Sequence, residues 1–135
     1  MTELDNIVST AFQNPGNQDL INKAYLFFLQ TLLFIPVKKE KSASTDEPFS
    51  PLFTKIENNH YMLAFDTLDR LKNWAKDAMD QIDYVELPGV DIISGINNNV
   101  YLCLNIGTDF YKEFSPDEIR HLKKIVTKVQ QLKNL

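Results

Sequence analysis

The spacing of apolar residues near the start of the chain predicts two helices. Apolar side chains recur at the i, i+3 and i+4 intervals of one helix face, at Leu4, Ile7, Val8, Ala11 and Phe12. Residues 14–17, Asn-Pro-Gly-Asn, should end this helix because they combine a proline with a glycine. A second helix is then expected over residues 18–29.

Residues 24–37 form the most apolar run, with eleven aliphatic or aromatic residues in fourteen. A helix of this length would span about 21 Å, which is short of the roughly 30 Å hydrocarbon core of a membrane. Gln30 and Thr31 also interrupt the run. We therefore expect the helix to end near Gln30 and residues 31–37 to form a strand that ends near Pro36, with the whole run in the protein core.

Four later segments have the composition of strands. Residues 52–57 and 61–65 flank Asn58-Asn59, a pair that tolerates positive φ, and are expected to form a hairpin. Residues 84–87 and 100–106 are also predicted strands, with a short helical or irregular crossover over residues 88–96 between them.

Two more helices are predicted by their caps and apolar stripes. Asp66 or Thr67 should cap a helix with an inward stripe of Leu68, Leu71, Trp74, Ala75 and Ala78. Ser115-Pro-Asp-Glu118 has the pattern of a capping box with proline at the first helical position. The last helix should then dock on the sheet through Leu122, Ile125, Val126, Val129 and Leu132.

This order of elements predicts an α+β fold, a single domain over residues 1–135 with a mixed five-stranded sheet covered by helices. The hairpin requires antiparallel pairing, whereas the helical crossovers between later strands favour parallel pairing. Residues 38–48 are charged or small and contain no large apolar side chain, so we expect a flexible loop there.

Composition narrows the class of protein. The net charge of −4 and the pI near 5.1 argue against a protein that coats nucleic acid or anionic lipid with its whole surface. Cys103 is the single cysteine, which excludes an intramolecular disulfide and suits a reducing compartment. The acidic N-terminus lacks the positive start of a secretory signal, so we expect a cytoplasmic protein.

The sequence predicts no catalytic residue, no metal site and no cofactor. The four glycines are too far apart for a dinucleotide fingerprint or a Walker loop. His60 and His121 lack a partner at metal-binding spacing, and Cys103 lies in an apolar strand where a thiol stays protonated. A solvated acidic face is the favoured interpretation of Asp77, Asp80, Asp83, Glu86 and Asp91.

Residues 105–109 form a candidate ligand-binding turn after the last predicted strand. Gly107 can adopt positive φ, and Asn105, Thr108 and the loop amides could contact a small ligand. Most turns of this kind have no ligand, so a purely structural turn is the competing interpretation.

The last helix carries the clearest charge asymmetry. From Ile119 onward the chain has five basic residues and no acidic one, so with a total of −4 the preceding residues carry −9. Arg120, Lys124 and Lys128 are four apart and share one ridge, with Lys123 beside it. A solvated face favoured by the helix dipole explains this pattern, and a binding site for an acidic protein partner is the functional alternative.

Four segments make the chain resemble the N-terminal domain of the SseB family, named for enhanced serine sensitivity. They are Pro51-Leu-Phe53, the run from Leu63 to Ala75, Leu104-Asn-Ile-Gly107 and Phe114-Ser-Pro-Asp-Glu-Ile119. The resemblance extends from the second helix to the last. The family often has Asn-Pro-Gly where this chain has Asn105-Ile-Gly107. The resemblance implies a bacterial protein and no particular enzymatic activity.

We therefore expect a non-catalytic cytoplasmic interaction or regulatory module, with Arg120, Lys123, Lys124 and Lys128 as partner-binding residues. One alternative is a small-ligand or enzyme-subunit role centred on Asn105, Gly107 and Thr108. Another is binding of nucleic acid or a membrane surface by the basic helix, which the net charge disfavours and which steep salt dependence would reveal. The partner's identity and any self-association stay open.

Overall fold

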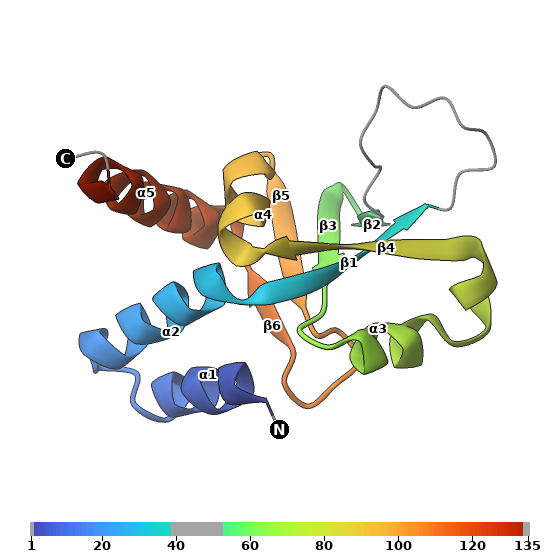
Figure 1. The fold of residues 1–135 in the computed structure, drawn as a ribbon, viewed down its shortest axis with the longest axis horizontal. Coiled ribbons are helices and arrows are strands. Elements are labelled where there is room, and N and C mark those ends of the chain that lie inside the picture. The colour runs from blue at the N-terminus through green and yellow to red at the C-terminus, as the bar shows by residue number, and fades with distance from the viewer. Residues whose placement is uncertain (1, 39–52, 134–135) are drawn as a thin grey trace.

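The computed structural model describes residues 2–38 and 53–133 (Figure 1). In chain order the elements are α1 (Glu3–Gln13), α2 (Gln18–Gln30), β1 (Leu32–Lys38), β2 (Phe53–Ile56), β3 (Asn59–Ala64), α3 (Leu68–Ala75), the 3-10 helix η1 (Lys76–Gln81), β4 (Ile82–Pro88), α4 (Gly89–Gly95), β5 (Val100–Leu104), β6 (Lys112–Phe114) and α5 (Pro116–Lys133). The fold is α+β, as predicted. Residues 39–48 of the predicted flexible loop lie outside the described residues.

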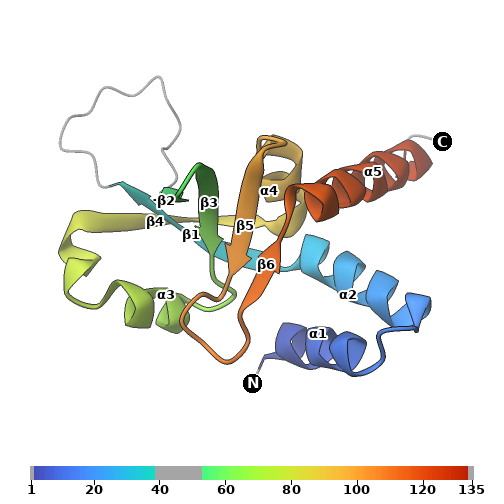
Figure 2. The same cartoon turned by 180° about the vertical axis from the view of Figure 1, so that it is seen from behind.

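Helices α1 and α2 form a hairpin at the N-terminal end of the chain, and they lie side by side in Figures 1 and 2. A complete capping box starts α1, because the Thr2 hydroxyl accepts a hydrogen bond from the Asp5 amide while the Asp5 carboxylate accepts one from the Thr2 amide. The side chain of Asn17 caps α2 by accepting from the Leu20 amide at 3.2 Å. The predicted helices at both positions are therefore confirmed.

The apolar run 24–37 divides as predicted, with α2 ending at Gln30 and β1 beginning at Leu32. Phe28, Leu33 and Ile35 are at most 1% exposed, which confirms that the run belongs to the core. Leu32 is 48% exposed, so the burial is not complete along the run. None of the helices in the described part of the chain is long and apolar enough to cross a membrane.

The prediction of one five-stranded sheet is wrong. The strands form a two-stranded antiparallel ribbon, β1–β4, and a four-stranded sheet in the order β2-β3-β5-β6. In the second sheet β3 and β5 are parallel and the other two pairs are antiparallel, so the mixed character is confirmed. Strand β6 was not predicted because three residues, Lys-Glu-Phe, are too few to show an alternating pattern.

Among the described residues, a single β-bridge joins the ribbon to the sheet. Phe34 of β1 donates to the Phe65 carbonyl at 2.7 Å, and the Phe65 amide donates back to the Phe34 carbonyl at 2.9 Å. The neighbouring Ala64 carbonyl instead accepts from the Asn105 amide, which follows β5. Because successive residues of a strand direct their amides to opposite edges, β1 contacts β3 at the edge that faces away from β5.

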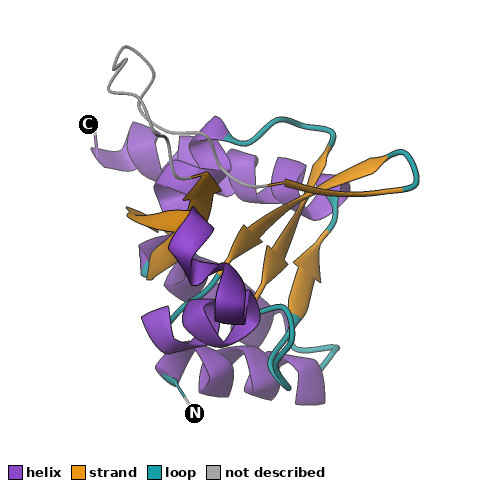
Figure 3. Ribbon diagram, turned by 90° about the vertical axis from the view of Figure 1, so that its right-hand side faces the viewer, coloured by secondary structure: helices purple, strands orange, loops and turns teal. Residues whose placement is uncertain are grey.

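The core lies on both faces of the strands, as their alternation requires. Leu33, Ile35, Met62, Ala64, Leu102 and Leu104 belong to the larger cluster, with buried side chains from α1, α2, α4 and α5. The intervening Leu63, Phe65 and Cys103 form a smaller cluster with Leu71 of α3. In the view of Figure 3, helices lie above and below the strands.

Three local predictions need correction. The hairpin turn consists of Glu57 and Asn58, not Asn58-Asn59, and Glu57 takes the positive φ of 55°. Helix α3 ends at Ala75, before Ala78, and continues as η1. Only half of the predicted capping box of α5 forms, since Ser115 accepts from the Glu118 amide at 3.3 Å while the Glu118 carboxylate bonds to other side chains.

Candidate functional site

The basic residues of α5 divide into two groups with different environments. Arg120, Lys124 and Lys128 are exposed, and we call them the basic ridge. Arg120 forms an i, i+3 ion pair with Asp117, in which both side chains are more than half exposed. A pair this accessible to solvent contributes little to stability. The ridge is therefore accessible to a partner.

Lys123 has a structural role that the sequence analysis did not foresee. Its ammonium donates to the Ile96 carbonyl at 2.6 Å and to the Asn98 side chain at 2.9 Å. The last carbonyls of a helix lack partners within the helix, and Ile96 is the C-cap of α4. Lys123 thus joins α5 to the end of α4, which separates it from the exposed ridge.

The candidate ligand-binding turn is closed by its own hydrogen bonds. Asn105 is 1% exposed with a φ of 58°, and its side-chain oxygen accepts from the Asp66 amide at 3.0 Å. The Thr108 hydroxyl donates to the Asn105 carbonyl at 2.8 Å and accepts from the Phe110 amide at 3.1 Å. Gly107 is exposed and has a φ of 84°. The side-chain oxygen of Asn105 and the hydroxyl of Thr108 are thus engaged within the chain.

Next to this turn, a buried polar cluster joins α1 to α3. The guanidinium of Arg70 bonds both carboxylate oxygens of Asp5, at 3.0 and 2.6 Å, and Asp66 at 2.7 Å. The Thr2 hydroxyl donates to Asp66 at 2.6 Å. Arg70 also lies over the Phe110 ring, 5.2 Å from its centroid. Arg70 pairs with both carboxylates, and these contacts connect α1 to α3.

These contacts control the pKa values of the cluster. Burial alone would raise the pKa of Asp5, but hydrogen bonds from Arg70 and Thr2, together with the charge of Arg70, lower it below its usual value. The hydrogen bond to Asp5 raises the pKa of Arg70. Asp5 and Arg70 therefore stay ionised near neutral pH.

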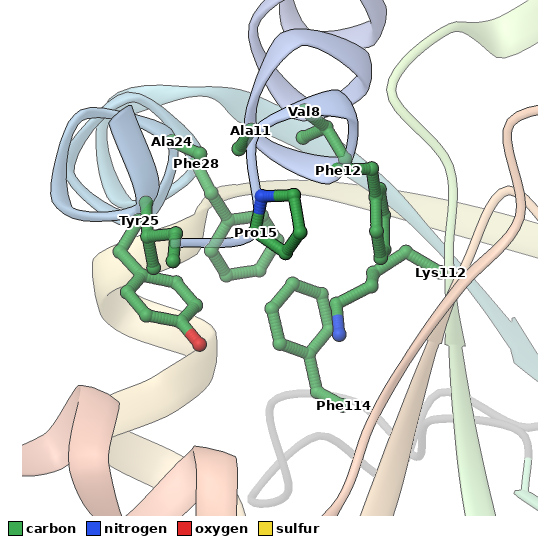
Figure 4. A pocket seen from close by; sticks show the side chains of 10 residues that line it. Val8, Ala11, Phe12, Pro15, Ala24, Tyr25, Phe28, Lys112 and Phe114 are labelled. Atoms are coloured by element: carbon green, nitrogen blue, oxygen red, sulfur yellow. The ribbon is translucent and has the colours of Figure 1, made fainter. Parts of the chain in front are cut away.

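An open apolar groove lies between α1, α2 and β6. Its volume is about 250 Å³, and its lining comprises Val8, Ala11, Phe12, Pro15, Ile21, Ala24, Tyr25, Phe28, Lys112 and Phe114. Figure 4 shows the side chains of these three elements surrounding the hollow. Phe12, on the last turn of α1, is 62% exposed. A large apolar side chain at the rim of an apolar hollow is typical of an interaction site.

Lys112, Glu118 and Tyr25 form a polar network at the edge of the groove. The Lys112 ammonium donates to both oxygens of Glu118, at 3.1 and 3.0 Å, and lies 5.0 Å from the centre of the Phe114 ring. The Tyr25 hydroxyl donates to the same carboxylate at 3.2 Å. Burial, followed by the charge of Glu118, raises the pKa of Tyr25 to about 12. Tyr25 is therefore a neutral donor at physiological pH.

The groove and the basic ridge are neighbours on the molecular surface. Tyr25, which lines the groove, packs edge to face against His121 of α5 with 5.6 Å between ring centroids. Lys124 and Lys128 follow His121 by three and seven residues, and these intervals keep side chains on the same side of a helix. The ridge thus begins beside the groove and extends away from it along α5.

The sequence analysis missed this groove for a local reason. Phe12 fits the apolar stripe of α1 and was expected to face the core, but α1 ends one residue later, at Gln13. Near this end of the helix the ring lies at the rim of the groove and stays 62% exposed. Lys112 and Phe114 could not be placed either, because β6 was not predicted.

The described side chains offer little for metal or nucleophilic chemistry. In residues 2–38 and 53–133, no group of three or more His, Cys, Asp or Glu could hold a metal ion. Cys103 is 2% exposed, and burial raises the pKa of its thiol, which keeps it protonated. Its sulfur lies 3.6 Å from the Tyr111 hydroxyl.

Comparison with known proteins identifies the family of the chain. No curated protein and no solved structure matches the sequence. The SseB protein N-terminal domain matches residues 8–121, from the middle of α1 to the second turn of α5. This match covers most of the chain and includes both walls of the groove and the start of the ridge. The chain belongs to the SseB family, in which it corresponds to the N-terminal domain.

Proposed function

We propose that the chain is a non-catalytic protein-interaction module that docks an acidic protein partner on the basic ridge of α5. One observation carries the proposal: Arg120, Lys124 and Lys128 are exposed on one helix face, in a segment without any carboxylate from Ile119 onward. Exposed charges of one sign accelerate association with an oppositely charged surface and contribute little to folding.

The charge of the remaining chain supports the same proposal. Residues before Ile119 carry a net charge of −9 within a total of −4, so the molecule is polarised. An acidic partner is attracted to the ridge and repelled by most other surfaces. This arrangement favours one docking orientation over others.

The two alternatives have less support. A nucleic acid or an anionic membrane could also use the ridge, but each presents an extended charged surface, and the net charge of −4 opposes a contact that extends beyond the ridge. For a small ligand at the turn of residues 105–109, the Asn105 and Thr108 side chains already have partners inside the protein. A ligand would have to replace those hydrogen bonds.

The test compares the wild type with the triple variant Arg120→Glu, Lys124→Glu and Lys128→Glu. Each protein is immobilised and used to capture proteins from an extract of the source cells, and captured proteins are identified by mass spectrometry. We expect the variant to lose an acidic protein that the wild type retains, because reversing three charges replaces attraction with repulsion. Far-UV circular dichroism should be unchanged.

A matched control reverses three exposed lysines elsewhere, Lys55, Lys72 and Lys76, and produces the same net charge. This control should retain the partner. Capture of the same proteins by wild type and ridge variant at the same salt concentration would refute the proposal. Ridge-dependent binding of DNA, RNA or phosphatidylserine vesicles, without a protein partner, would replace it with one of the alternatives.

A further inference from the structure

The groove beside the ridge indicates what kind of segment the partner presents. We infer that the groove of α1, α2 and β6 takes one bulky apolar side chain of the acidic partner, carried on a short amphipathic helix whose carboxylates reach the basic ridge. This inference rests on the proposed function, because it concerns the same partner and adds a second point of contact.

The size and chemistry of the groove suit a ring or a branched aliphatic group. An apolar cavity of about 150 Å³ can hold a benzene molecule, and this groove has a volume of about 250 Å³. Of its lining residues Lys112 alone is charged, and its ammonium already donates to both oxygens of Glu118. The groove therefore offers burial of an apolar group and no unpaired charge for an anionic head group.

The spacing of groove and ridge favours a helical partner. His121 contacts Tyr25 at the groove, and Lys128 lies two helical turns further on the same side of α5, about 10 Å along the axis. A partner helix with an apolar residue in the groove and carboxylates one and two turns away on the same side would match these positions. Helices commonly dock in apolar grooves in this way.

Phe12 is the residue on which this contact depends most. Its ring is 62% exposed at the rim, and the Lys112 ammonium lies 5.6 Å from its centroid. A partner side chain in the groove would cover this ring from the open side. Aromatic residues covered in this manner are enriched among those that dominate binding energy.

The test uses three synthetic peptides of equal length as probes. The first is an amphipathic helix with a Leu and Phe stripe and Glu at the flanking positions, the second has the same stripe with Lys in place of Glu, and the third keeps Glu but replaces the stripe with Ala. Binding is measured by fluorescence anisotropy at two salt concentrations. We expect the first peptide to bind at least about tenfold more tightly than either of the others.

Two protein variants test whether peptide binding depends on the groove or on any exposed apolar side chain. Phe12→Ala should weaken binding of the first peptide about tenfold, as expected for an interfacial aromatic anchor. Leu132→Ala is the matched control, because Leu132 is also 62% exposed but does not line the groove, and it should leave binding unchanged. Both substitutions are at exposed positions, and circular dichroism checks that both variants fold.

The outcomes distinguish the inference from the proposed function. Equal, ridge-dependent binding of the two Glu peptides would refute the anchor and leave the acidic partner in place. Equal binding of the Glu and Lys peptides, with loss in Phe12→Ala, would refute the acidic partner. Binding of none of the three peptides would refute the inference and leave the acidic partner to the capture test of the ridge. A concentration-dependent dimer that Phe12→Ala abolishes would also refute the inference, because a second copy would then occupy the groove.

Discussion

The guanidinium of Arg70 lies 2.6 Å from the carboxylate of Asp5, and this contact joins α3 to α1 across 65 residues of the chain. Asp5 is 2% exposed and Arg70 16%, so the pair is largely removed from solvent. Arg70 also neutralises Asp66, whose side chain is 1% exposed. Loss of this one cation would leave two buried carboxylates unpaired.

Replacing Arg70 with Met should therefore destabilise the protein strongly. The substitution keeps an apolar stem but removes the charge, and we expect a loss of about 3 kcal/mol in the free energy of unfolding at neutral pH. Urea denaturation measures this loss. Arg120→Met is the control, because the Arg120–Asp117 pair is exposed, and it should cost less than about 0.5 kcal/mol.

The effect of Arg70→Met should also depend on pH in a defined direction. The pKa of Asp5 is lowered in the folded protein, so its contribution to stability is present above the unfolded pKa of about 3.9 and is lost as pH falls through the folded value. The stability difference between wild type and variant should shrink between about pH 5 and about pH 2. A difference that is constant with pH would show that the cost arises from packing alone.

Two substitutions of Asn105 should separate the contribution of its backbone conformation to stability from that of its side-chain hydrogen bond. Its φ is 58°, which costs little for Asn or Gly and more for Ala, and its side chain satisfies the Asp66 amide. Asn105→Gly should lose about 1–2 kcal/mol through the missing hydrogen bond, and Asn105→Ala about 1 kcal/mol more. Equal stability of the two variants in thermal denaturation would contradict the proposed role of the backbone.

Gly89 is required where α4 begins against the end of α2. A β-carbon at this position would lie 2.3 Å from the Phe28 carbonyl oxygen and 3.1 Å from the Leu29 α-carbon, both of which belong to the backbone. We expect Gly89→Ala to reduce the free energy of unfolding by about 2 kcal/mol or more, because helices must move apart. Gly95→Ala has open space around it and should be close to neutral or stabilising.

The edge of the groove can be examined through the titration of Tyr25. Burial first, and then the negative charge of Glu118, raise its pKa to about 12. In Glu118→Gln the repulsion is removed and burial remains, so the pKa should fall part of the way toward the usual value of about 10. Nuclear magnetic resonance of ring-labelled tyrosine measures both values. A wild-type Tyr25 that titrates with exposed tyrosines would contradict the described network.

Local signals in the sequence predicted most elements because those elements depend on nearby residues. The amphipathic stripe of α1 apart from Phe12, the cap of α3 at Thr67 and the Ser115 cap of α5 are confirmed. The division into two sheets was not predictable in this way. Strand β1 pairs with the distant β4 and meets the second sheet through the bridge between Phe34 and Phe65, and neither strand carries a local signal for its partner.

In the candidate site, too, only features that depend on nearby residues were predictable from the sequence. The exposure of Arg120, Lys124 and Lys128 was predictable from helical spacing alone. The structural role of Lys123 was not, because its partner carbonyl is 27 residues away. The groove combines α1, α2 and β6, and its lining residues Val8 and Phe114 are 106 residues apart, so no single segment carries a signal for it.

The pairing of β1 with β4 has a consequence for how the chain folds. The β1–β4 pair that is closest in sequence, Lys38 and Ile82, is separated by 44 residues, whereas the β2–β3 hairpin closes across Glu57 and Asn58. The entropy lost in closing a loop increases with its length, and contacts between distant residues slow folding. The α1–α2 and β2–β3 hairpins should therefore form early. We expect the ribbon to close after these hairpins, and its closure to limit the folding rate.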